Sequence, residues 1–411
     1  MPEPGAVSDD YISALCTNIA FRCRQFSVTK LKTLYIGGGT PSLLSHKQLD
    51  RIITAVRNAA SLSQNVEITM EANPADITGE LLAFLEEAGI NRLSVGIQSV
   101  DQKVLAALGR RSDAECIEKT LRLLETRWLS RGHRLSLDLI AGLPGLSDEA
   151  FERGVNRVIA TGADHISLYA LMLEEGTRLE KQVSEGTVEY SDEVNDRQWI
   201  KGRDMLVSSG LAQYEVSNFA RPGFESRHNS SYWHMNDYLG TGAGGTGTVG
   251  SYRWTETTDI CAYTHFWNSD YMNERTAGGG ASCHASAPSP QSGRVRYLSA
   301  AARYEDPQPA TLSFIEADNP PAEVELLDDD TREFEFLMMG FRLLEGVSDA
   351  EYCRRFGKKL TERIGAREGG LFDDWQKRGL ARTYKTADED TRHALTEEGI
   401  LLLNQFLEAL L

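Results

Sequence analysis

The sequence predicts an α/β protein: an open, partial β/α TIM-like barrel followed by a small C-terminal helical, winged-helix-like domain. Two observations predict the barrel. Five short apolar segments alternate with helical segments over residues 31–171, and polar or glycine residues stand near the ends of these apolar segments. Near-continuous apolar strands that alternate with helices are typical of a parallel sheet covered by helices.

The expected elements follow in a regular order. A helical pattern covers residues 8–25, with Ser8 or Asp9 as its cap. Strands are expected at 31–36, 66–70, 92–97, 135–140 and 165–171, and helices at roughly 46–60, 77–89, 101–127 and 147–161. A further helix at 192–209 leads to a sixth strand at 214–219. Ligands of such folds bind at the carboxyl ends of the strands, so the functional site is expected there.

The chain divides into four regions. Residues 1–220 are expected to form the partial barrel, and residues 221–265 a segment rich in aromatic residues and then in glycine. Residues 266–330 are expected to form an acidic low-complexity insertion and linker, with a run of small residues at 276–293. Residues 331–411 have helical patterning and are expected to form the C-terminal domain.

Composition limits the classes of partner. The 411 residues include 43 Lys and Arg against 60 Asp and Glu, and the net charge of −17 makes nucleic acid an unexpected partner. Residues 352–359 include a cluster of basic side chains, but the C-terminal region around it has more acidic than basic residues. We therefore interpret the cluster as the solvent-exposed face of a helix. No apolar run approaches the ~20 residues that span a bilayer. The first residues do not resemble a signal peptide, so a cytoplasmic protein is expected.

The six cysteines are scattered along the chain and are expected to be free thiols. They are Cys16, Cys23, Cys116, Cys261, Cys283 and Cys353. Cys16 and Cys23 would share one face of a helix, but two thiolates do not complete a four-ligand metal site. No metal-ligating residues are therefore predicted in the chain as written.

A glycine run follows the first strand. Gly37, Gly38 and Gly39 precede Thr40 and Pro41. A loop without side chains lets its backbone approach a ligand, and its N–H groups suit a carboxylate or a phosphate. The alternative is a tight turn from strand to helix, but three glycines exceed what such a turn needs.

Polar side chains stand at or near the ends of later strands. Glu71 ends the second strand, Gln98 ends the third, and Asp138 lies late in the fourth, while Arg110 follows in LGRR. Gln98 offers a donor and an acceptor, and Arg110 can clamp a carboxylate with two hydrogen bonds. For each residue alone, a salt bridge or a helix cap is the more common explanation. Together they suit an amino acid joined to a ribose, as in S-adenosylmethionine (SAM).

Several segments resemble one known family. IGGGTPSLLS, EANP, LSVGIQSV, LDLIAGLPG and HISLYALMLEEGT are similar to the SAM-binding strand ends of radical-SAM proteins. The family is the one that holds oxygen-independent coproporphyrinogen III oxidase and the haem chaperone HemW. YEVSNFARPGFESRHNSSYW, from Tyr214, resembles the HemW group in particular, including its HNxxYW motif. The resemblance covers nearly the whole chain apart from an insertion near 270–320.

The resemblance implies a radical-SAM type of barrel and a role for each matching residue. Gly38, Gly39 and Thr40 would contact the methionine moiety of SAM, and the remainder would be held by Glu71, Gln98, Arg110 and Asp138. His228, in HNSSYW, would be the axial haem ligand. An exposed His-Asn pair is more often only a turn. However, imidazole is a common haem ligand, and Tyr232 and Trp233 would add an apolar wall.

The sequence departs from the family pattern in two places. In the family, CxxxCxxC after the first barrel strand binds a 4Fe-4S cluster, with SAM on the fourth iron. This sequence has neither the triplet nor the strand, so we expect weak SAM binding, no cluster on the chain as written, and an upstream in-frame extension that encodes both. The second departure is GAGGTGT (242–248), where Thr246 replaces an expected histidine.

The favoured function is that of a HemW-like haem chaperone, which binds haem and transfers it to haem-accepting proteins. Peripheral membrane association through those acceptors stays open. One alternative is an oxygen-independent coproporphyrinogen III oxidase, an enzyme of porphyrin biosynthesis. The other is a cluster-less remnant that acts as a binding protein. The HNSSYW motif favours the chaperone over the oxidase.

Overall fold

The computed structural model describes residues 7–269, 296–299, 313–316 and 322–410. The chain divides into two compact units. Unit 1 is Met1–Leu34, Leu43–Glu67 and Met235–Arg332, and unit 2 is Tyr35–Ser42, Ile68–His234 and Glu333–Leu411. Each unit therefore combines segments that are far apart in the sequence.

A seven-stranded sheet contains the five strands that the sequence predicts. They are β1 (Lys30–Ile36), β2 (Ser61–Ala72), β3 (Arg92–Gln98), β4 (Arg134–Ala141) and β5 (His165–Ala170). The strand order is β1-β2-β3-β4-β5-β7-β6, and the pairs β2–β3, β3–β4 and β4–β5 are parallel. The sheet has two edges and does not close, which confirms the expected open α/β barrel.

The sixth strand expected at 214–219 is instead part of a short hairpin. β6 (Ala212–Gln213) pairs antiparallel with β7 (Asn218–Ala220), and β7 pairs antiparallel with β5. The Tyr214 N–H donates to the Asn218 carbonyl at 3.1 Å and closes the turn between them. The prediction of one continuous strand is wrong because an alternating apolar pattern does not reveal where a chain reverses direction.

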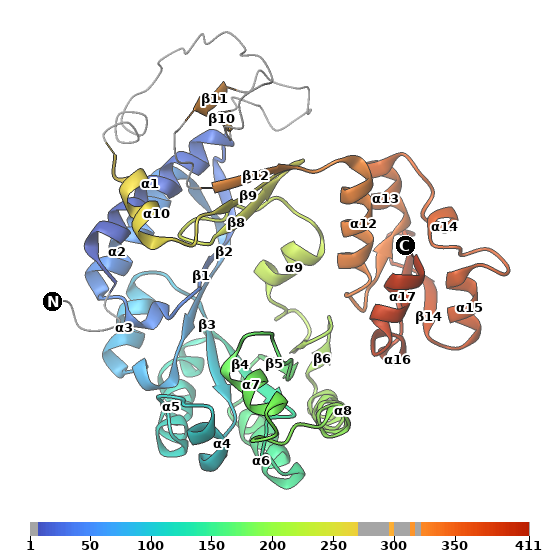
Figure 1. The fold of residues 1–411 in the computed structure, drawn as a ribbon, viewed down its shortest axis with the longest axis horizontal. Helices are drawn as coiled ribbons and strands as arrows, with labels where there is room; N and C mark the ends of the chain where they lie inside the picture. Colours follow the sequence, from blue (N-terminus) through green and yellow to red (C-terminus); the bar gives the residue numbers. More distant parts are fainter. Residues whose placement is uncertain (1–6, 270–295, 300–312, 317–321, 411) are drawn as a thin grey trace. The chain divides into compact units, whose positions relative to one another are not determined.

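Helices follow the strands in turn along the chain (Figure 1). The predicted helices correspond to α1 (Asp9–Gln25), α2 (His46–Ala59), α3 (Gly79–Glu87), α6 (Asp148–Ala160) and α8 (Asp192–Ser208). The segment 101–127 was expected to be one helix but forms two, α4 (Gln102–Ala107) and α5 (Ala114–Arg127). Gly109 lies between them with a φ of 65°, a conformation that ends a helix. This interruption creates the loop that carries Arg110.

Unit 1 joins α1 to a second sheet through a buried ion pair. The sheet has the order β12-β9-β8, formed by β8 (Thr246–Val249), β9 (Tyr252–Glu256) and β12 (Ala322–Leu326). Arg22 of α1 and Glu256 of β9 are both about 1% exposed and lie 2.5 Å apart. Asn18 donates to the same carboxylate oxygen at 3.1 Å. The stretch expected to be linker therefore contributes β12 to this sheet.

The glycine-rich loop at 242–245 is anchored by side chains of α1 and of α10 (Ile260–Trp267). The Gly242 N–H donates to Asn18 Oδ1 at 3.1 Å and to the Tyr263 hydroxyl at 3.2 Å, and the Ala243 N–H donates to Tyr11. The loop amides are thus occupied within unit 1. The low-complexity run expected at 276–293 lies outside the described residues, whereas β10 (Arg296–Ser299) pairs antiparallel with β11 (Ser313–Glu316).

The C-terminal region is mainly helical, as predicted. Its helices are α12 (Asp329–Gly340), α13 (Asp349–Phe356), α14 (Leu360–Arg363), α15 (Leu371–Lys377), α16 (Glu397–Ile400) and α17 (Leu403–Leu410). A small sheet of order β13-β15-β14 accompanies them, formed by β13 (Val347–Ser348), β14 (Ala381–Lys385) and β15 (Thr391–Leu395). Phe341, Phe372 and Phe406 pack against one another in its core.

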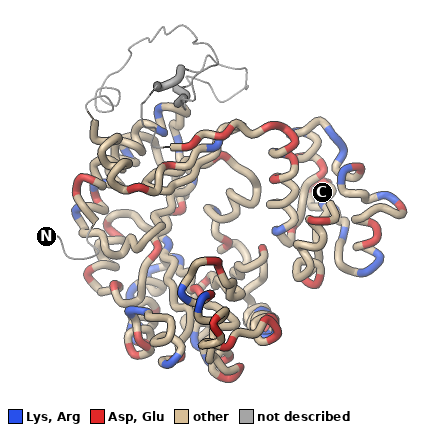
Figure 2. The backbone as a smooth tube through the Cα atoms, viewed as in Figure 1, with Lys and Arg blue, Asp and Glu red and all other residues tan. Residues whose placement is uncertain are grey.

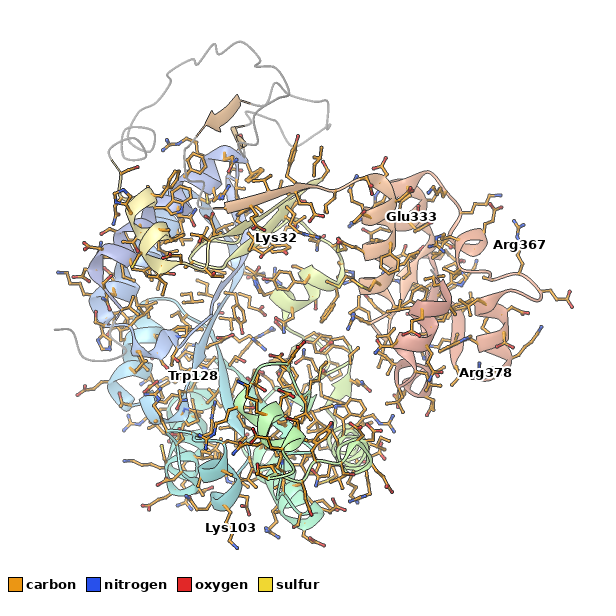
Figure 3. All side chains as sticks on the ribbon, in the orientation of Figure 1. Lys32, Lys103, Trp128, Glu333, Arg367 and Arg378 are labelled. Carbon is orange, nitrogen blue, oxygen red and sulfur yellow. The ribbon has the colours of Figure 1, made fainter. Side chains whose placement is uncertain are left out.

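Charges of both signs lie along this region (Figure 2). In the basic cluster, Lys358 forms an ion pair with Glu333 of α12, and Arg355 lies 2.7 Å from Glu351. Glu333 is labelled in Figure 3. Much of the positive charge of the cluster is therefore neutralised within the region. None of the helices in the described residues is long and apolar enough to cross a membrane.

Candidate functional site

One face of the sheet in unit 2 carries alternating polar side chains. The register pairs Glu71 with Ser94, Gly96 with Asp138, and Asp138 with Ser167. Residues paired in this way in neighbouring strands project to the same side of a sheet. The predicted residues Glu71 and Asp138 therefore share one face and lie toward the carboxyl ends of their strands.

Glu71 connects the first strand to the glycine loop. The Tyr35 hydroxyl donates to Glu71 Oε1 at 2.7 Å, and the Gly38 N–H donates to Glu71 Oε2 at 3.2 Å. Burial and the neighbouring Glu71 carboxylate raise the pKa of Tyr35 above its usual range, so the phenol stays protonated and acts as a donor. The sequence reasoning missed Tyr35. The sequence feature that could have indicated Tyr35 is its position between Leu34 and Ile36, just before the glycine loop.

The glycine loop has the geometry that its composition suggests. A Cβ atom at Gly37 would lie 2.6 Å from Tyr35 Cε1 and 2.9 Å from Glu71 Oε1, so a side chain does not fit there. Gly38 and Gly39 have φ values of 75° and 62°, which favour glycine. No heavy atom lies within 4 Å of the Cβ position of either residue. The loop, with Thr40 after it, leaves backbone accessible beside Glu71.

Gln98 and Arg110 come together over Gly96. An Arg110 Nη donates to the Gly96 carbonyl at 2.9 Å, and a Cβ atom at Gly96 would lie 2.9 Å from Gln98 Nε2. Gln98 has a φ of 66°, which is unusual for a residue other than glycine, and its buried Oε1 has no hydrogen-bond partner. Such strained residues cluster at functional sites.

Arg110 has no carboxylate partner among the residues that the structure describes. Its neighbour Arg111 instead lies 2.8 Å from Asp76. Partial burial, followed by the charge of Arg111, lowers the pKa of Arg110 from its usual value. A half-buried guanidinium without a counter-ion can accept an anionic group such as a ligand carboxylate.

Asp138 is a carboxyl with an elevated pKa. Its pKa is raised to about 6, with burial as the largest cause and the charge of Glu71 as a smaller one. Hydrogen bonds from Ser167 and Ser94 and the charge of Arg92 oppose this rise. Its buried Oδ1 has no hydrogen-bond partner. An acceptor of this kind, close to Glu71, can receive a hydrogen bond from a hydroxyl or an amine of a ligand.

His228 contacts the same group of residues. It lies in α9 (Arg227–Trp233), which the Ser226 side chain caps by accepting the Asn229 N–H at 3.2 Å. The His228 and Tyr35 rings stack with centroids 4.9 Å apart at 20°. His228 Nε2 also forms a hydrogen bond of 2.9 Å with the Tyr232 hydroxyl. The HNSSYW segment is therefore a short helix rather than the turn that the sequence left as an alternative.

Two other histidines have structural partners. His165 is buried between Ser136 at 2.8 Å and the Tyr214 hydroxyl at 2.9 Å. Burial, with the nearby charges of Arg92 and Arg134, lowers its pKa well below the usual value, so the imidazole is neutral. His234 Nε2 lies 3.1 Å from Glu345.

The residues that the structure describes fit SAM but not an iron–sulfur cluster. The exposed glycine backbone, the unpaired Arg110 and the unsatisfied oxygens of Gln98 and Asp138 are features that an amino acid joined to a ribose can satisfy. Among the described residues, no three His, Cys, Asp or Glu side chains gather into a group that could hold a metal ion.

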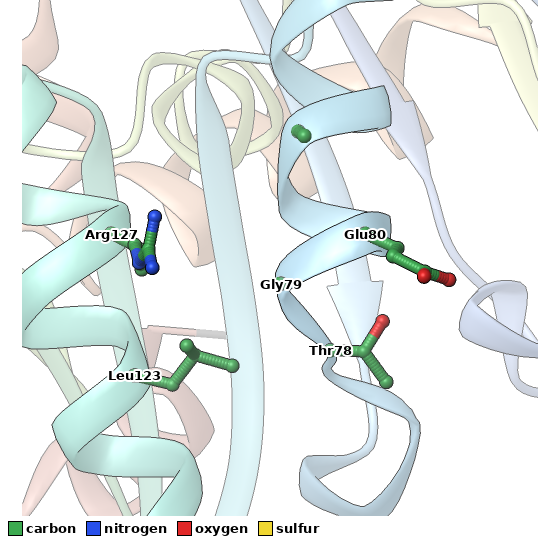
Figure 4. Close-up of a pocket in the computed structure, with 6 residues that line it drawn as sticks. Thr78, Gly79, Glu80, Leu123 and Arg127 are labelled. Carbon is green, nitrogen blue, oxygen red and sulfur yellow. The ribbon is translucent and has the colours of Figure 1, made fainter.

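A separate pocket of about 700 Å³ lies between α3 and α5. It is lined by Thr78, Gly79, Glu80, Ala83, Leu123 and Arg127 (Figure 4). None of the residues predicted to bind a cofactor lines it. The Thr78 hydroxyl is already occupied, since it accepts the Leu81 N–H at 3.1 Å as the cap of α3.

Comparison with known proteins identifies two family regions. Residues 18–158 match the radical SAM superfamily, and residues 327–402 match the HemN C-terminal domain. The heme chaperone HemW of Lactococcus lactis is 34% identical over 252 residues, which cover 61% of this chain and 64% of that protein. HemW of Bacillus subtilis is 32% identical over 261 residues, which cover 63% of this chain and 67% of that protein. The chain thus spans roughly two thirds of these curated relatives.

A solved structure shows the same fold. Coproporphyrinogen III oxidase (HemN) from Escherichia coli superimposes with a TM-score of 0.69 over 98% of this chain and 82% of that chain, at 19% sequence identity. At this identity the match concerns the fold alone. It includes both the barrel and the C-terminal region.

Proposed function

This chain is a HemW-like member of the radical-SAM family, and we propose on that basis that it binds haem through His228 and delivers it to haem-accepting proteins. The observation that carries the proposal is the contact between the HNSSYW histidine and the strand-end residues. His228 stacks on Tyr35, which in turn bonds to Glu71. The matching relatives named heme chaperone support the same assignment.

We also propose that SAM binds beside this histidine. The methionine moiety would contact Gly38, Gly39 and Thr40, and the remainder of SAM would be held by Glu71, Gln98, Arg110 and Asp138. The family implies a 4Fe-4S cluster as a second cofactor, for which the described residues offer no cysteine set. We therefore propose the binding and delivery of haem as the function of this protein. We propose the cytoplasm as the place where the protein acts.

Haem titration followed at the Soret band tests the assignment of His228. We expect His228→Ala to weaken haem binding by about tenfold or more, because the iron loses its imidazole ligand. His234→Ala is the matched control, since His234 follows the same helix and pairs with Glu345 instead. Equal spectra and affinities for wild type and His228→Ala would eliminate His228 as the ligand.

A further inference from the structure

Tyr35 contacts both the candidate SAM site and the candidate haem ligand. One face of its ring lies against the His228 imidazole, with centroids 4.9 Å apart. Its hydroxyl donates to Glu71 Oε1 at 2.7 Å, and Glu71 Oε2 accepts the Gly38 N–H at 3.2 Å. Three consecutive contacts therefore run from His228 to the glycine loop through the side chains of Tyr35 and Glu71.

We propose that Tyr35 is a positioning residue that couples the two sites, so that bound SAM increases the affinity of His228 for haem. This inference rests on the proposed function. SAM would contact both Glu71 and Gly38. A bound SAM would therefore restrain the Glu71 carboxylate, which accepts the hydrogen bond from Tyr35 and the one from the Gly38 N–H. An ordered Tyr35 in turn restrains the ring of His228. A ligand that orders a shared element lowers the entropic cost of binding the second ligand.

The stacking geometry allows haem ligation and positioning together. A bond from imidazole nitrogen to iron lies in the plane of the ring, whereas Tyr35 covers a face of the ring at an interplanar angle of 20°. Tyr35 therefore orients the imidazole without competing for its nitrogen. Competition for Nε2 comes from Tyr232, which is on the same helix as His228.

Tyr35 also has little freedom to move toward the loop. The Cβ position of Gly37 is only 2.6 Å from Tyr35 Cε1, so the ring already occupies the space that a side chain at position 37 would fill. When Glu71 and the loop are held in place, the Tyr35 ring is consequently held in place as well, because there is no empty space between them. Close-packed groups transmit such displacements.

Haem affinity of the full chain, measured with and without saturating SAM, tests the coupling. We expect SAM to lower the Kd for haem by about fivefold or more in the wild type. Tyr35→Phe keeps the aromatic ring but removes the bond to Glu71, so SAM should no longer change the Kd. Tyr190→Phe is the matched control, because it removes another phenol that donates to a carboxylate, Asp192 at 2.8 Å. This control should keep the wild-type response to SAM.

The outcomes separate this proposal from the proposed function. Failure of the wild type to bind haem, or an unchanged affinity in His228→Ala, refutes the haem assignment itself. If haem binds through His228 but its Kd is the same with and without SAM, Tyr35 coupling is refuted. Calorimetry establishes SAM occupancy, and a wild type that binds no SAM also refutes the coupling. Linkage requires haem to tighten SAM binding by the same factor, so the reverse titration gives a second measurement that needs no variant.

Discussion

The hydroxyl of Tyr232 forms a hydrogen bond with Nε2 of His228, one of the two imidazole nitrogens that can ligate iron. In the proposed haem complex, the 2.9 Å bond between His228 Nε2 and this hydroxyl would have to break for Nε2 to be the ligand. In the free protein the bond holds the imidazole in a defined orientation. The same bond opposes ligation, so the motif itself contains a competitor for the metal.

Tyr232→Phe is expected to tighten haem binding. It removes the competing hydrogen bond but keeps the aromatic wall, and a typical bond of this kind contributes about 0.5–1.5 kcal/mol. The Kd for haem should then fall by about 2- to 12-fold in Soret titrations. Weaker binding would show that the hydroxyl stabilises the haem complex rather than competing with it.

Sequence reasoning found the strand-end residues but not the contacts between them. Glu71, Gln98 and Asp138 are recognisable because each is a polar residue at or near the end of an apolar strand. Tyr35 is not, because its role depends on His228, which is distant in sequence and reaches it only after folding. The unsatisfied oxygens of Gln98 and Asp138 likewise follow from packing and have no signature in the sequence.

Among the elements, the loop after β1 depends on a residue without a side chain at position 37. A Cβ atom at Gly37 would meet both members of the Tyr35–Glu71 bond, and its neighbours Gly38 and Gly39 adopt left-handed conformations. The shape of the loop is therefore determined by close packing at Gly37 and by the backbone conformations of Gly38 and Gly39.

Gly37→Ala should disturb this loop. The added methyl group would overlap the Tyr35 ring and the Glu71 carboxylate, and overpacking of this kind typically costs about 1–3 kcal/mol. We expect a lower urea midpoint of unfolding and weaker SAM binding. Gly79→Ala, at the first position of α3 where no atom lies within 4 Å of the Cβ position, should be neutral or stabilising. Equal unfolding midpoints for Gly37→Ala and the wild type would contradict the steric argument.

The regular elements were predictable and the interruptions were not. Apolar periodicity located β1 to β5 and the helices between them, because their burial pattern repeats along the sequence. The hairpin of β6 and β7 reverses direction over residues 214–217, and the break between α4 and α5 contains Gly109. Among the described residues between α4 and α5, Gly109 alone has a positive φ. A single glycine in a sequence does not by itself indicate that a helix ends there.

At the scale of the whole molecule, unit 2 encloses three carboxyl groups with raised pKa values. Burial is the largest cause for each, and it raises the pKa to about 6 for Asp138 and Asp164 and to about 7 for Glu215. Each group binds its proton more tightly in the folded state than in the unfolded state. Their contribution to stability is therefore complete at low pH and is lost as the pH rises through the folded pKa values.

Glu215→Gln should remove part of this pH dependence. Glu215 is 1% exposed, and its pKa rises from 4.5 to about 7, so the wild type should lose stability between about pH 4.5 and 7. The loss is at most about 3 kcal/mol. Urea unfolding at pH 5 and pH 8 should show the variant gaining on the wild type at pH 8. Glu189→Gln, at an exposed position, is the control and should show no such gain. A constant difference between Glu215→Gln and wild type at both pH values would exclude this carboxyl as the source.

The ion pair between Arg22 and Glu256 has a consequence for how the chain folds during its synthesis. Asn18, beside Arg22, bonds to a carboxylate 238 residues further along the chain. At about 5–20 residues per second, a ribosome needs roughly 12–50 seconds to make that interval. Helix α1 consequently leaves the ribosome long before its partner exists, with a guanidinium that is buried in the finished protein. Unit 1 therefore completes its fold late. Ile12 and Ile19 of α1 can pack against Ile52 and Val56 of α2 as soon as both helices are made, but the face that carries Arg22 stays uncovered until β9 follows.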